Sequence, residues 1–110
     1  MKVQIADLVF VSAELGSIDH HIALEVVERL QKHFGTTYTL DNVIISATHT
    51  HAGPSGYWHS RTDTGLDGGF YPAHFDAIVT GITSSVIAAH EDLQPGNILI
   101  NTGRVADAGV

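Results

Sequence analysis

Two histidines, His49 and His51, have the residue type and spacing that could carry chemistry. They directly follow an apolar run that reads as a strand, and side chains two positions apart on an extended chain project to the same face. Neutral imidazole binds Zn²⁺ at about 2.0–2.1 Å, so both rings could converge on one metal ion. A pair of histidines that are merely hydrogen-bonded is the alternative that this short pattern leaves open.

A catalytic zinc site needs about three protein ligands and a water molecule, so a third ligand has to come from another position. The nearby candidates, Asp63, Asp67 and His59, all lie in a segment without helical or strand periodicity. The chain has no cysteine, which excludes a thiolate zinc site. His59 reads better as a solvated loop residue, and the remaining histidines are predicted to be surface or helix-capping residues: His20, His21, His33, His74 and His90.

The elements that must position this pair alternate along the chain. The first helix has apolar residues at four-residue steps, with Ser17 as a predicted N-cap and Gly35 at its end. The second starts at Pro72 and stops at Pro95 and Gly96. The predicted order is a strand at 5–11, a helix at 18–34, a strand at 43–47, a loop at 52–70, a helix from residue 72 and a strand at 97–101.

This β-α-β-loop-α-β order predicts an α/β fold with mainly parallel strands and with helices packed on the sheet. The strands are apolar enough to be buried on both faces, and two helices cannot cover both faces of a sheet. We therefore expect residues 1–110 to be a single partial domain of a larger α/β catalytic unit. His49 and His51 would then lie at the carboxyl end of a strand, where α/β folds place their sites.

Composition excludes several classes of function. Five Lys and Arg against twelve Asp and Glu give a net charge of −7, and the basic residues are scattered, so no nucleic-acid partner is expected. No apolar run approaches the roughly 20 residues of a transmembrane helix. The sequence has no P-loop, no Gly-x-Ser-x-Gly elbow and no His-Glu-x-x-His motif.

The segment around the two histidines resembles a known family. Residues 41–54, Asp-Asn-Val-Ile-Ile-Ser-Ala-Thr-His-Thr-His-Ala-Gly-Pro, closely resemble the Thr-His-Thr-His-Ser-Gly-Pro segment of the neutral (non-lysosomal) ceramidases. The likeness extends over residues 8–110. Ala52 stands where the family usually has Ser, and Ser55 where Gly is common; both changes are small.

The resemblance implies a zinc-dependent amide hydrolase that cleaves the N-acyl bond of ceramide to sphingosine and a free fatty acid. Under it, His49 is a zinc ligand, and His51 is a catalytic residue that contacts the substrate or the reacting oxygen. The other ligands and a catalytic Arg are expected from parts of a larger enzyme outside this chain, so we expect an internal fragment that is inactive alone. The family also suggests a secreted or membrane-associated extracellular enzyme.

Two other interpretations remain open. In the first, the chain is a small non-catalytic metal-binding module that uses His49, His51 and a loop carboxylate such as Asp67. In the second, it is a non-catalytic domain in which both histidines are structural. Zinc should bind tightly to the first and should leave the stability of the second unchanged.

Overall fold

The computed structural model describes residues 7–59 and 69–106, which contain two parallel strands and two long helices. The strands pair in parallel, with Val9 opposite Val43 and Ala13 opposite Ala47. This arrangement confirms the predicted α/β class. In chain order the elements are β1 (Val9–Ala13), α1 (His20–Phe34), the short 3₁₀ helix η1 (Gly35–Thr37), β2 (Val43–Ala47) and α2 (Pro72–Glu91).

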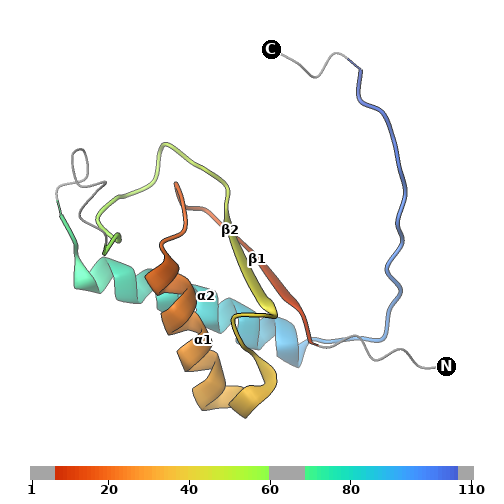
Figure 1. Ribbon diagram of the computed structural model, residues 1–110, viewed down its shortest axis with the longest axis horizontal. Coiled ribbons are helices and arrows are strands. Elements are labelled where there is room, and N and C mark those ends of the chain that lie inside the picture. The colour runs from red at the N-terminus through yellow and green to blue at the C-terminus, as the bar shows by residue number, and fades with distance from the viewer. Residues whose placement is uncertain (1–6, 60–68, 107–110) are drawn as a thin grey trace.

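Both helices lie on the same side of the strand pair (Figure 1). Val9, Val11 and Ala13 of β1 point toward the helices and pack against the core. On the opposite face, Phe10 is 67% exposed and Ile44 is 49% exposed. Within the described residues the helices therefore cover one face of the strands and leave the other open, as expected where two helices cannot cover both faces.

Helix α1 forms because its apolar residues recur along one face. Ile22, Val26 and Leu30 are 0% exposed and make up the centre of the core. The helix ends at Phe34, and Gly35 follows with φ of 64°, the left-handed conformation that glycine adopts without steric cost. The predicted N-cap is wrong: the Oδ1 of Asp19, not Ser17, accepts a hydrogen bond from the first turn.

Helix α2 begins at the predicted proline, whose missing N–H costs nothing in a first turn. It ends at Glu91, a few residues before the proline and glycine that were expected to stop it. Its buried apolar residues, Val79, Ile82 and Val86, belong to the same core as the apolar face of α1. An ion pair between Arg29 and Asp76, with a nitrogen-to-oxygen distance of 2.6 Å, also joins the two helices.

The predicted third strand at 97–101 does not form. After α2 the chain runs away from the sheet as an extended segment (Figure 1), and residues 93–105 have no regular secondary structure. Ile98, Leu99 and Ile100 are 79%, 92% and 90% exposed. Residues such as Ile98 and Ile100, which are apolar and β-branched, favour a strand. A strand forms only where a second backbone lies beside it, however, and this segment runs away from the sheet (Figure 1).

Candidate metal centre

His49 lies just beyond the end of β2 and has an unusual backbone. Its φ is 61°, and among the described residues it is the one non-glycine residue with a positive φ. A left-handed conformation costs a residue with a Cβ about 1–2 kcal/mol, and such residues cluster at functional sites. This backbone turns the histidine back toward the end of β1, so that its ring reaches the loop after that strand.

The His49 ring is held in one tautomer by the β1–α1 loop (residues 14–19). The Nδ1 of His49 lies 2.7 Å from the carbonyl oxygen of Gly16. A carbonyl can only accept, so Nδ1 carries the proton and donates it, and Nε2 keeps its lone pair. Histidines that bind metals typically have this arrangement, with one ring nitrogen bonded to a carbonyl or carboxylate and the other free for the ion.

His51 lies beside His49, as their spacing predicts. The two Nε2 atoms are 3.3 Å apart, and the rings meet edge to face at a centroid distance of 4.8 Å. Two imidazole nitrogens on one tetrahedral zinc ion are separated by about 3.3 Å, because each Zn–N bond is about 2.0–2.1 Å long. Both side chains are exposed, so the pair fits a zinc ion as well as a hydrogen bond between the rings.

A small pocket adjoins His51. Its volume is about 180 Å³, and it is lined by the β1–α1 loop and by the segment after His51, including Tyr57 and Trp58. Tyr57 is 3% exposed, and its hydroxyl donates to the carbonyl of Ser17 at 3.1 Å while accepting from the Ser17 N–H at 3.3 Å. Tyr57 therefore anchors this segment to the loop that holds His49.

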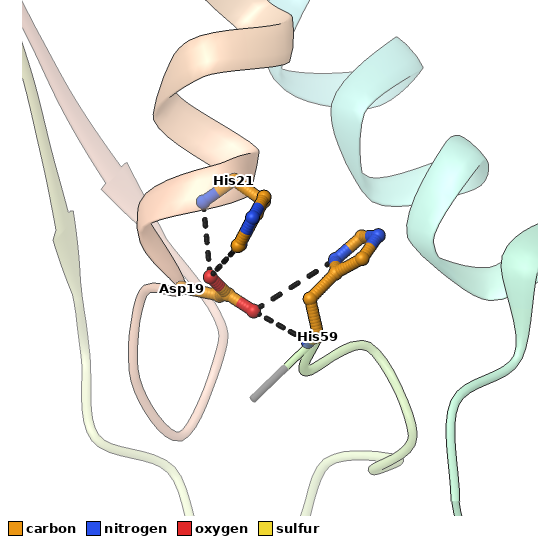
Figure 2. Close-up of side chains that lie close together, drawn as sticks. All are labelled: Asp19, His21 and His59. Carbon is orange, nitrogen blue, oxygen red and sulfur yellow. Dashed lines mark hydrogen bonds and ion pairs between the residues drawn. The ribbon is translucent and has the colours of Figure 1, made fainter. Parts of the chain in front are cut away.

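A second group of possible metal ligands lies at the start of α1 (Figure 2). Asp19, His21 and His59 each offer a ligand atom, and these atoms all lie within 4.8 Å of one another. The Oδ1 of Asp19 is 3.0 Å from the Nδ1 of His21, and its Oδ2 is 3.9 Å from the Nδ1 of His59. The two imidazole rings are stacked at a centroid distance of 4.5 Å.

Asp19 stays ionised in this group. Its burial would raise the pKa, but hydrogen bonds from the backbone N–H groups of His21 and His59 and from the His21 ring outweigh that effect. The pKa of Asp19 consequently lies below its ordinary value of 3.8. A buried carboxylate that keeps its charge can accept hydrogen bonds or bind a cation.

The predicted site residues are thus divided between two places. His49 and His51 come together, whereas His59, a candidate third ligand, lies against Asp19 and His21. Asp63 and Asp67, the other two candidates, are outside the described residues.

Sequence reasoning missed the partners of several other histidines. His21 and His59 contact Asp19, the His74 ring bonds the Ser55 carbonyl at 2.8 Å, and the His90 ring bonds the Tyr38 hydroxyl at 2.6 Å. Most of these pairs are 19 to 52 residues apart, so local spacing carries no signal for them. Only the Asp19–His21 pair is local, and the preference of Asp for helix N-caps could have indicated it.

Comparisons with known proteins identify the family. Residues 2–110 match the family model described as neutral/alkaline non-lysosomal ceramidase, N-terminal. The chain belongs to this family. The resemblance seen around His49 and His51 therefore holds for almost the whole chain.

Individual ceramidases show the extent of the likeness. Neutral ceramidase 3 of Arabidopsis thaliana is 46% identical over 103 residues, which are 94% of this chain and 14% of that protein. The neutral ceramidase of Mycobacterium tuberculosis is 40% identical over 105 residues, or 96% of this chain and 16% of that protein. The chain therefore spans about one seventh of the length of these relatives.

A solved ceramidase has the same local fold. The crystal structure of neutral ceramidase from Pseudomonas aeruginosa matches with a TM-score of 0.76 and 39% sequence identity, over 79% of this chain and 14% of that one. This match places the two strands and two helices within a ceramidase fold. Within the part of the chain that the structure describes, neither helix is long and apolar enough to cross a membrane.

Proposed function

We propose that this ceramidase-family chain supplies part of a zinc-dependent site that hydrolyses the N-acyl bond of ceramide to sphingosine and a fatty acid. The observation that carries the proposal is the lone pair that His49 keeps on Nε2, 3.3 Å from the Nε2 of His51, because its Nδ1 donates to Gly16. Membership of the family supports ceramide as the substrate. The chain covers a small share of its relatives, so the other active-site groups are proposed to come from outside these residues.

The residues of the chain would act in distinct ways. His49 would hold zinc through Nε2. When bound, the ion would polarise an amide carbonyl as a Lewis acid and lower the pKa of a water molecule toward about 7. His51, whose Nε2 faces the same point, would hold a proton where it can contact the reacting oxygen. Tyr57 would keep the pocket beside His51 in shape by anchoring it to Ser17.

A chimeric enzyme tests the proposal. This chain replaces the matching segment of the Pseudomonas aeruginosa ceramidase, and hydrolysis of a fluorescent ceramide is measured for the chimera and two variants. In His49→Asn the amide can still donate to Gly16 and the residue still tolerates a positive φ, but it lacks a ligating ring nitrogen. His33→Ala removes an exposed histidine at the other end of α1 and serves as the control.

We expect an active chimera, an active His33→Ala variant and a kcat/KM lowered at least about a hundredfold in His49→Asn. A folded chimera without activity would contradict the proposal, as would full activity in His49→Asn. Circular dichroism and gel filtration establish that each protein is folded. A non-catalytic metal-binding module predicts a different result, namely tight zinc binding by this chain alone that is lost in Asp67→Ala.

A further inference from the structure

We propose that Asp19, His21 and His59 form a second divalent-cation site, separate from the His49–His51 pair, and that this site takes Zn²⁺. The proposal does not depend on amide hydrolysis. It rests on the arrangement of one carboxylate and two imidazoles around a common point at the start of α1 (Figure 2).

The ligand types match a borderline divalent ion. Two histidines and one carboxylate are a common set for zinc, and they leave a fourth position for water. Ligand atoms around a tetrahedral zinc ion are about 3.3 Å apart. The distances from the Asp19 oxygens to the two Nδ1 atoms, 3.0 Å for His21 and 3.9 Å for His59, lie on either side of that value. The three ligand atoms all lie within 4.8 Å of one another, so an ion between them would draw them closer together.

The carboxylate of Asp19 is buried and is held in place by backbone hydrogen bonds. Asp19 is only 4% exposed, and its two oxygens are fixed by the backbone N–H groups of His21 at 2.9 Å and His59 at 2.7 Å. An ionised carboxylate has about four acceptor positions, so each oxygen has a second position beyond its backbone bond, and on Oδ1 this position accepts from the Nδ1 of His21 at 3.0 Å. A cation would replace the His21 ring proton as the partner of this carboxylate, with the Nδ1 of His59 3.9 Å from the other oxygen.

One side of the proposed site is open to solvent, and the other side is apolar. The side chain of His21 is 53% exposed, so an ion can enter from solvent past this ring. The ring of His59 packs against Phe70 and Phe75, at centroid distances of 4.1 and 4.7 Å. Apolar packing of this kind restricts the ring and lowers the local polarity around the ion, which favours binding by charged ligands.

A cation here would clamp two segments that are 40 residues apart in sequence. One is the β1–α1 loop, which bonds His49 through Gly16, and the other is the segment that runs from His51 to His59. The ion would hold the second segment in place beside the His49–His51 pair.

The test is a calorimetric titration of the full chain with Zn²⁺. The background is His49→Asn with His51→Ala, which removes the first pair of histidines. We expect one ion per chain in this background and a melting temperature that rises with zinc concentration. His21→Ala should weaken binding at least about tenfold, whereas His20→Ala, which removes the neighbouring exposed histidine, should leave it unchanged.

A second variant keeps the test informative if His21→Ala fails to fold. His59→Gln removes the other imidazole and keeps a polar side chain of similar size, and circular dichroism shows which variants retain their helices. Zinc affinity unchanged in the folded variants, or no zinc binding by the background, would overturn the proposal. In that case the three residues would hold the two segments together through hydrogen bonds alone.

Discussion

At the residue scale, His49 combines a positive φ with a ring nitrogen bonded to a backbone carbonyl; His74 has such a ring contact too, but without the positive φ. The positive φ of His49 directs the ring toward β1, and the Gly16 carbonyl fixes the tautomer. His51 has neither constraint, and its described ring partner is His49 itself. We therefore expect the two histidines to differ in what is lost when each is removed.

His51→Ala in the chimeric enzyme should retain zinc and lose turnover. The proposed ligand is His49, so metal content should stay at the level of the unmodified chimera, while kcat falls by about a hundredfold or more through loss of a proton-handling group. Metal analysis and a ceramide hydrolysis assay on the same sample separate the two effects. Loss of zinc together with activity would instead make His51 a ligand.

Asp19 should make the stability of the chain depend on pH in the acid range. Its pKa is lowered in the folded state, so its contribution is fully present above its ordinary value of 3.8 and is lost as the pH falls through the folded value. As the pH falls, the unfolded chain takes up this proton before the folded chain does, so the free energy of unfolding decreases. Urea unfolding without metal should show the free energy of unfolding falling more steeply below about pH 4 in the native chain than in Asp19→Asn. Parallel curves would contradict this account.

At the element scale, the β1–α1 loop organises the site. Three of its residues reach the segment after β2: Gly16 bonds His49, Ser17 bonds Tyr57, and Asp19 bonds the backbone of His59. The loop follows the carboxyl end of β1, and His49 follows the carboxyl end of β2. Parallel pairing brings these two ends to the same edge of the sheet, which is why the contacts form.

A glycine in the segment after His51 should tolerate no side chain. Gly56 has φ of 87°, and a Cβ there would overlap the ring of Tyr71. We expect Gly56→Ala to destabilise the fold by about 1–3 kcal/mol through backbone strain and overpacking. Gly81→Ala is the matched control, because nothing lies within 4 Å of a Cβ at this position in α2, and it should stabilise by about 0.5–1 kcal/mol. Chemical denaturation measures both, and equal effects would contradict the prediction.

Local sequence patterns predicted the helices and strands better than they predicted the contacts between residues far apart in the sequence. The apolar face around Ile22, Val26 and Leu30 and the strand Val43–Ala47 were readable, because periodicity and β-branched runs are local properties. The segment 97–101 has the same local character and forms no strand, because pairing depends on a distant backbone. The cluster of Asp19 with His59 was missed for the same reason, since it joins residues 40 apart.

At the scale of the whole molecule, the described residues have one covered face and one open face. Phe10 and Ile44 lie exposed on the open side of the strands, and the chain spans about one seventh of its relatives. An apolar sheet face normally packs against another layer. The prediction that the chain is a single partial domain of a larger α/β unit is consistent with this open face and remains a prediction.

The chain alone should not hydrolyse ceramide. The described residues bring two histidines to the proposed site, with His49 as the proposed ligand, and a catalytic zinc site needs about three protein ligands. Incubation of the purified chain with fluorescent ceramide and excess zinc should give no turnover above the rate without protein. Turnover that is abolished in His49→Asn would show that these residues make a complete active site, against this expectation.

The most direct test of the central claim, that His49 binds zinc, is the zinc content of the chimeric enzyme with and without His49. Metal analysis at equal protein concentration should show His49→Asn holding one zinc ion fewer per molecule than the unmodified chimera, while His33→Ala holds the same number. An unchanged zinc content in folded His49→Asn would contradict the claim, because the Nε2 lone pair of His49 would then have no role as a ligand.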